Sequence, residues 1–130
     1  MSQTIKSARD QIVSLFTTGT LPNATLAAVG VGAVYDCEPT SYSSRLAVTV
    51  QGSSVTPTAY NIRVRAYRQV ISADGDAQLG HNEILDTVNA LDTLTKSSAY
   101  QGPSSWDISF DLDTGAYVAE TTLEVPRDTF

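Results

Sequence analysis

The sequence predicts one α+β domain, with a mostly antiparallel sheet and two helices packed on one face of it. Two segments, residues 3–16 and 81–96, carry apolar side chains at helical spacing. Two pairs of segments alternate apolar and polar residues, as the strands of hairpins do. Runs of strands separated by lone helices favour such a sheet. With 130 residues, 42% of them hydrophobic, the chain is long enough to bury one core, so residues 1–130 are assigned to a single domain.

The first predicted helix covers residues 3–16. Its apolar side chains fall on one face: Ile5, Ala8, Ile12 and Phe16. Ser2 or Thr4 can cap its start, because short hydroxyl side chains accept hydrogen bonds from the first free backbone N–H groups. Gly19 and Pro22 then end the helix and begin a loop.

Residues 26–35 are apolar at both alternating positions and include Gly30 and Gly32. Two glycines so close together weaken a helix, so the segment is predicted as a buried strand. A helix remains the alternative, since a short apolar run does not distinguish the two by periodicity.

The next two strands are predicted at residues 45–51 and 59–71. A short segment with Gly52 and Pro57 joins them, which indicates an antiparallel hairpin. In the second strand one face is apolar and the other polar. Residues 74–80 are predicted to be a loop.

An amphipathic helix follows at residues 81–96, with a stripe of apolar residues that fits the face of a sheet. Apolar residues then alternate with acids from Trp106 to Asp113, and the return strand covers residues 116–125. Gly115 stands where a tight hairpin needs a left-handed backbone. Pro126 ends this strand, and residues 127–130 are predicted to be a tail.

The charge and the single cysteine narrow the classes of function. A net charge of −6 argues against general nucleic-acid binding and against docking on an anionic membrane. Cys37 has no second cysteine to pair with, which favours a reducing compartment such as the cytoplasm. The chain opens with polar residues rather than a secretion signal, and its longest apolar run is about half the length that a membrane-spanning helix needs.

No motif predicts an enzyme, a cofactor or a metal site. His81 is the only histidine, and no nucleophile motif accompanies it. The segment Asp74-Gly75-Asp76 resembles part of a calcium loop, but Glu83 stands at the wrong spacing for it. We therefore predict a protein without catalytic residues or cofactors.

Two groups of charged residues are the candidates for contacts. Arg63 and Arg65, with Arg68 nearby, form a basic patch that could meet acids of another copy, such as Glu120 or Glu124. Cross-strand ion pairs within one chain explain the same pattern equally well. A second group comprises three acids on or beside one strand: Asp107, Asp111 and Asp113.

The order of these elements resembles that of the tail terminator, or tail-completion, proteins of long-tailed bacteriophages. Those short chains also open with an amphipathic helix, followed by a strand pair, a second helix and a closing hairpin. Here the corresponding segments are residues 3–16, 45–71, 81–96 and 106–125. No invariant motif supports the resemblance, and residues 26–35 depart from it.

The resemblance implies a virion protein of the tail or neck, assembled in the host cytoplasm. Copies of the chain, usually six, would form a ring that stops the tail tube from growing and contacts tail-tube and head-neck proteins. A channel that passes DNA should repel phosphates, so we expect Asp107, Asp111 and Asp113 to face the lumen. Arg63 and Arg65 would then pair with a neighbouring copy.

Two other functions stay open at this stage. The chain could be a barrel-like α+β domain that binds or transforms a small molecule in a pocket lined by Trp106, Tyr60, Tyr117 and Phe110. It could also be another phage part, such as a head-closure or tube subunit. The polar loops 36–44 and 72–80 are long enough to act as arms between subunits.

Overall fold

The computed structural model describes residues 4–42, 44–71, 75–96 and 105–127 of the protein. The elements in these ranges are α1 (Ile5–Phe16), β1 (Thr17–Thr18), β2 (Leu21–Pro22), α2 (Ala24–Ala28), β3 (Ala33–Tyr35), β4 (Leu46–Val55), β5 (Ala59–Gln69), α3 (Asp76–Lys96), β6 (Asp107–Asp111) and β7 (Ala116–Pro126). Strands β3 to β7 form one sheet, and β1 and β2 a separate short pair. The fold is α+β with a mostly antiparallel sheet, as predicted.

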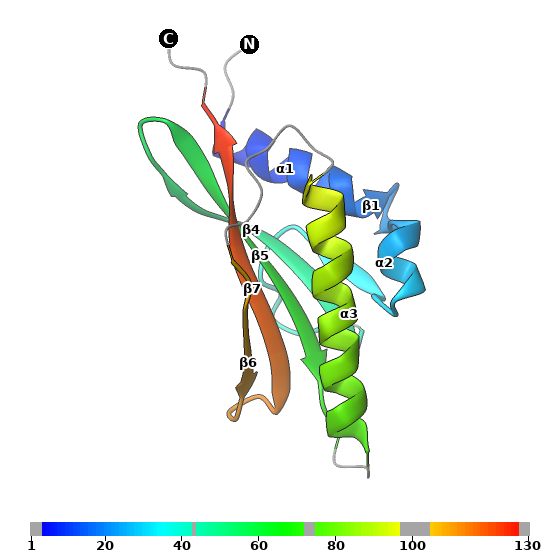
Figure 1. Ribbon diagram of the computed structural model, residues 1–130. Helices are drawn as coiled ribbons and strands as arrows, with labels where there is room; N and C mark the ends of the chain where they lie inside the picture. The colour runs from blue at the N-terminus through cyan, green and yellow to red at the C-terminus, as the bar shows by residue number, and fades with distance from the viewer. Residues whose placement is uncertain (1–3, 43, 72–74, 97–104, 128–130) are drawn as a thin grey trace.

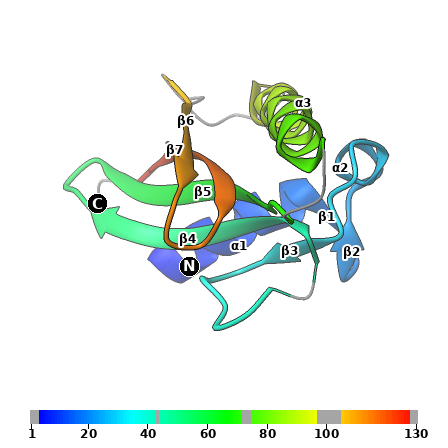
Figure 2. The same cartoon turned by 90° about the horizontal axis from the view of Figure 1, so that it is seen from below.

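The strand order in the main sheet is β3-β4-β5-β7-β6 (Figures 1 and 2). Both predicted hairpins are present, β4 with β5 and β6 with β7, and β5 pairs with β7 between them. The short β3 runs parallel to β4 at one edge, while β6 forms the other edge. Both long hairpins are therefore parts of one continuous sheet.

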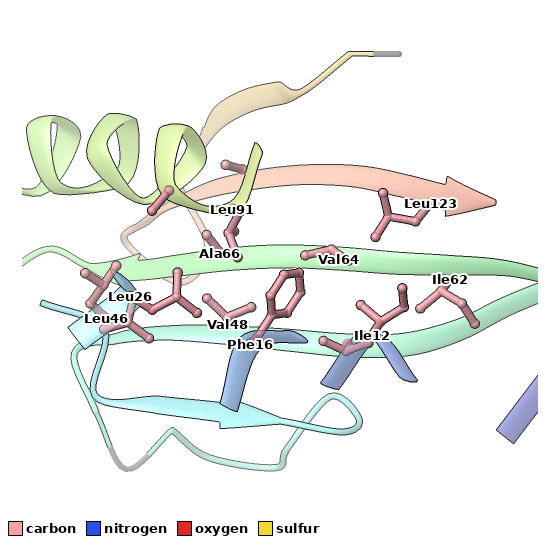
Figure 3. Packing of buried hydrophobic residues seen from close by; sticks show 14 of the residues in the cluster. Ile12, Phe16, Leu26, Leu46, Val48, Ile62, Val64, Ala66, Leu91 and Leu123 are labelled. Atoms are coloured by element: carbon pink, nitrogen blue, oxygen red, sulfur yellow. The ribbon is translucent and has the colours of Figure 1, made fainter. Parts of the chain in front are cut away.

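The hydrophobic core lies between the helices and one face of this sheet (Figures 1 and 3). Side chains from α1, α3 and the alternate residues of β4, β5 and β7 meet there, among them Ile12, Phe16, Val48, Val64 and Leu91. The helix-free face carries the other alternate residues, because successive side chains of a strand point to opposite faces. The predicted packing of two helices on one face is present, and α2 adds a third helix whose Leu26 is fully buried.

Helix α1 begins at Ile5, two residues after the predicted start, and one of its two predicted caps precedes it. Thr4 caps it: the backbone N–H of Ser7 donates to the Thr4 hydroxyl at 3.1 Å, and the Thr4 N–H donates to the Ser7 hydroxyl at 2.9 Å. This reciprocal pair satisfies two backbone N–H groups that have no hydrogen-bond partner within the helix.

Residues 26–35 form neither one strand nor one helix, so both expectations for this segment need correction. The short helix α2 ends in a Schellman motif, in which Val31 N–H donates to Leu26 C=O and Gly30 N–H donates to Ala27 C=O, each at 3.1 Å. Gly30 has a φ of 99°, which a glycine adopts at little cost. The chain therefore turns there and forms β3 only from Ala33 onward.

Helix α3 begins at Asp76, five residues before the predicted start, so residues 76–80 are not a loop. Gly80 lies inside this added turn, where a Cβ atom would stand 3.3 Å from Val70 and 3.4 Å from Arg68. The glycine lets α3 approach the end of β5 closely. The mostly polar sequence of residues 74–80 had suggested a loop instead.

Two further expectations fail at the C-terminal end of the chain. The helices do not cover β6, so Ile108 and Phe110 stay about 40% exposed although they point to the apolar side. Arg127 is not part of a tail: its N–H donates to Thr58 C=O at 3.0 Å, and its guanidinium lies over the Tyr60 ring. The rest of the predicted tail, residues 128–130, lies outside the described residues.

The core makes a direct stability prediction. Leu91 is fully buried, whereas Leu79 on the same helix is 52% exposed. We expect Leu91→Ala to lower the free energy of unfolding by about 2–5 kcal/mol, because it leaves a cavity in a close-packed interior. The matched change Leu79→Ala should alter it by less than about 0.5 kcal/mol. Urea unfolding followed by circular dichroism measures both, and equal effects would contradict the packing.

Candidate subunit interface

The predicted basic patch lies on the helix-free face of the sheet, where acids of the same chain already pair with it. Arg63 Nε lies 3.0 Å from Glu120 Oε1, and Arg65 Nη2 lies 3.5 Å from Glu120 Oε2. Glu120 stands directly across from Arg65 in the β5–β7 ladder. The structure thus contains the cross-strand ion pairs that were the alternative to a contact with a second copy.

The segment before β4 folds over the same face. Tyr42 stacks on Tyr67 with their ring centroids 4.1 Å apart and the rings nearly parallel. Glu38 accepts hydrogen bonds from the Tyr42 hydroxyl at 3.0 Å and from the Thr49 hydroxyl at 3.2 Å, and it pairs with Arg65 at 3.1 Å. Burial, together with the bond to the Glu38 carboxylate, raises the pKa of Tyr42, so this residue stays protonated and donating.

This attachment bears on the predicted arms between subunits. Glu38 and Tyr42, in the first predicted arm, are bonded to the sheet of their own chain. The second predicted arm, residues 72–80, is helical from Asp76 onward, while residues 72–74 lie outside the described residues. A long free loop is therefore not available in the described part of either segment.

Arg68 does not belong to the patch of Arg63 and Arg65, which corrects the prediction for this residue. It points to the helix side of the sheet and is 1% exposed. Its guanidinium pairs with Asp76 at 3.0 Å and with Glu83 at 3.1 Å, both on α3. A side chain held in this way inside the chain is not accessible to another copy.

Asp76 joins the start of α3 to the end of β5. Besides its pair with Arg68, its carboxylate accepts the backbone N–H of Ile71 at 2.7 Å. The hydrogen bond from Arg68, followed by the bond from Ile71, lowers the pKa of Asp76 below its ordinary value. Ionised Asp76 therefore fixes where α3 begins.

Of the remaining predicted contact residues, Asp107, Asp113 and Glu124 are exposed, whereas Asp111 is half-buried. Asp107 and Asp111 lie on β6 and Glu124 on β7, all pointing to the helix-free face, whereas Asp113 lies in the turn between β6 and β7. Asp107 stands across the ladder from Glu120, which Arg63 and Arg65 already neutralise.

Two shallow hollows lie in the described surface. One, of about 340 Å³, is lined by polar groups of Ser105, Asp107, Glu120, Thr121 and Thr122. The other, which we call the α1 hollow, measures about 350 Å³ and is lined by Ile5, Lys6, Arg9 and Gly52.

The aromatic residues predicted to line a small-molecule pocket line neither hollow. Phe110 and Tyr117 are in contact, with ring centroids 5.0 Å apart. Tyr60 pairs with Val125, eight residues farther along β7, which is roughly 26 Å at the usual rise of a strand. Trp106 packs separately against the core. The four side chains therefore do not converge on one ligand.

The single histidine and the single cysteine of the chain are both exposed. The His81 ring, on α3, lies 5.2 Å from that of Tyr117 on β7, and Cys37 precedes β4. Among the described residues, no three His, Cys, Asp or Glu side chains are grouped as a metal ion would require. No helix in the described ranges is long and apolar enough to cross a membrane.

Neither the protein-family models nor the curated protein sequences with which the chain was compared match it. The site must therefore be interpreted from its own geometry.

The burial of Arg68 was not predicted, although the alternation of residues along β5 indicates it. Tyr60, Ile62, Val64 and Ala66 alternate on the apolar face of β5, and the same period of two places Arg68 with them. A buried arginine needs carboxylate partners, and Asp76 and Glu83 are two of the three acids that follow it most closely in the sequence.

The lowered pKa of Asp76 predicts a pH dependence. The ionised carboxylate stabilises the fold above its unfolded pKa of roughly 4, and this contribution is lost as the pH falls through the lower folded value. We expect Asp76→Asn to be less stable than the wild type at pH 7, with the difference shrinking between about pH 5 and pH 2. Urea unfolding at several pH values measures it. Asp86→Asn, on the exposed side of α3, is the control, and a pH-independent difference for Asp76→Asn would contradict the linkage.

Proposed function

We propose that the chain is a structural subunit of a phage tail or neck, whose copies form a ring that ends the tail tube and joins it to the head. The observation that carries this proposal is the exposure of large apolar side chains on one hairpin. Ile108 is 40% exposed, Phe110 41% and Leu112 86%. Apolar side chains gathered in this way mark a surface that contacts another protein.

The backbone of this hairpin supports the same conclusion. Strand β6 is the last strand of the sheet, so the outer edge of its backbone has no partner strand within the described residues (Figure 2). Edge strands that carry apolar residues associate readily with other chains. An assembly subunit would cover both the edge and its apolar side chains.

The resemblance in element order supports the phage assignment within the class of assembly proteins. The observed order of α1, the β4–β5 hairpin, α3 and the β6–β7 hairpin is the order expected of tail terminator proteins. On this basis the proposed partners are other copies of the chain, six to a ring, and the tail-tube and head-neck proteins on either side of it. The protein would be part of the virion after assembly in the host cytoplasm.

The charge of the chain suits a channel for DNA. A net charge of −6, with Asp107 and Glu124 exposed on the helix-free face, would repel phosphates and let DNA pass without being held. Arg63 and Arg65 are paired with Glu120 of the same chain, so the contact between copies is expected on another surface.

Association should depend on the exposed apolar side chains. We expect the purified chain to form closed rings, visible by negative-stain electron microscopy, with a matching mass by light scattering. Phe110→Asp should weaken association roughly tenfold to a hundredfold, the equivalent of about 1.5–3 kcal/mol for a buried apolar side chain.

Leu21→Asp is the matched control, because Leu21 is 69% exposed on β2 and lies outside the hairpin. A wild-type chain that remains monomeric at high concentration would contradict the proposed function. Equal association of the two variants would exclude the hairpin from the contact.

A further inference from the structure

The turn between β6 and β7, residues 111–115, presents one apolar side chain between two acids. We call this segment the tip. Leu112 is 86% exposed, with Asp111 on one side and Asp113 on the other. Gly115 N–H donates to Asp111 C=O at 2.8 Å, and Asp113 N–H donates to the Asp111 carboxylate at 3.0 Å. These two bonds, and the left-handed φ of 67° at Gly115, fix the turn so that Leu112 points outward.

The α1 hollow has the complementary character. Its apolar lining is Ile5, together with the bare backbone of Gly52, where a Cβ atom would stand 3.2 Å from Ile5 Cδ1. Its basic lining is Lys6, which is exposed, and Arg9, which pairs with the neighbouring Asp10 at 2.9 Å. The hollow is thus lined by both apolar and cationic residues.

The first turn of α1 adds to this positive character because it contains no acidic residue. The positive end of the helix dipole is therefore not offset by a side chain there, and an approaching carboxylate would be favoured.

The turn between β6 and β7 and the start of α1, which lines the α1 hollow, lie at opposite ends of the sheet (Figure 1). Gly52 pairs with Ile62 on β5, whereas Ala116, at the end of the tip, pairs with Gln69 seven residues farther along, roughly 23 Å away. A tip therefore cannot fill the hollow of its own chain. It can reach only the hollow of a second copy.

We propose that the tip of one copy docks in the α1 hollow of the next, with Leu112 on Ile5 and Gly52 and the acids of the tip beside Lys6 and Arg9. The contact joins two different surfaces, so it links copies head to tail; such contacts close into a ring when the rotation between copies allows it. This inference rests on the proposed assembly function and gives Asp111 and Asp113 a role at the subunit contact in place of the lumen.

Three substitutions test the contact, each with a matched control. Leu112→Asp should weaken association at least tenfold, while Leu79→Asp, which alters another exposed leucine, should not. Asp113→Lys and Lys6→Glu should each weaken it several-fold, and combining both in one chain should restore it. Asp86→Lys and Lys96→Glu are their controls, because both residues are exposed on α3. Light scattering measures the association, and circular dichroism verifies the fold of each variant.

Mixing two defective variants tests the head-to-tail geometry directly. Leu112→Asp lacks a working tip but keeps its hollow, whereas the double variant Lys6→Glu/Arg9→Glu lacks a working hollow but keeps its tip. Each alone should be a monomer. Together they should form a one-to-one dimer that cannot extend, because one tip and one hollow remain.

These experiments distinguish a failure of the contact between tip and hollow from a failure of the proposed assembly function. If the wild type forms rings and Leu112→Asp does so equally well, the docking of the tip is wrong and the ring remains. If the two defective variants do not combine into a dimer, the head-to-tail contact is also wrong. If the wild type itself stays monomeric at high concentration, both the contact and the assembly function fail.

Discussion

Helix α1 packs on β4 and β5, and α3 packs on β5 and β7, so the apolar face of the sheet is covered as far as β7 (Figure 3). Beyond that strand no helix in the described part of the chain continues the cover. The alternation of β6 still points Ile108 and Phe110 to the apolar side, where they remain exposed. Because exposed apolar area is unfavourable in water, the hairpin gains stability when another chain covers it.

The tip projects from one end of the sheet. A buried ion cluster of Arg68, Asp76 and Glu83 stabilises the same end. Arg68 is taken out of water there, at a cost that only good hydrogen-bonded partners offset, and Asp76 and Glu83 supply them. Two residues beyond Arg68, Val70 N–H donates to Gly115 C=O at 2.9 Å. The cluster therefore fixes α3, the end of β5 and the base of the tip relative to one another.

The sequence predicted those helices and strands in which the spacing of apolar residues repeats over the whole element. Both hairpins and the extent of α1 follow from the alternation and the helical spacing of their own residues. The start of α3 does not, because its first turn depends on a pair between Asp76 and a residue of another element, Arg68. Residues 26–35 were misjudged since a single cap at Gly30 divides a run whose composition is uniformly apolar.

The candidate contact was harder to predict than the fold for a geometric reason. Alternation tells which side of a strand a residue faces, but not whether a helix reaches that side, so the exposure of Phe110 could not be foreseen. The cations presented a different difficulty: opposite charges on neighbouring strands fit an internal pair and an external one equally well. The register, which sets Arg65 across from Glu120, supplies the internal pair.

The charges of β6 also restrict how two copies can meet. If two β6 edges paired antiparallel about Ser109, Asp107 of each copy would stand opposite Asp111 of the other, and like charges directly opposite each other destabilise a ladder. The acids therefore oppose symmetric edge pairing, which a chain of net charge −6 already disfavours. A contact between unlike surfaces escapes this repulsion, since the acids of the tip approach Lys6 and Arg9 instead. Asp111 thus both opposes a closed dimer and favours a directional contact, and a directional contact is the kind from which a ring can be built.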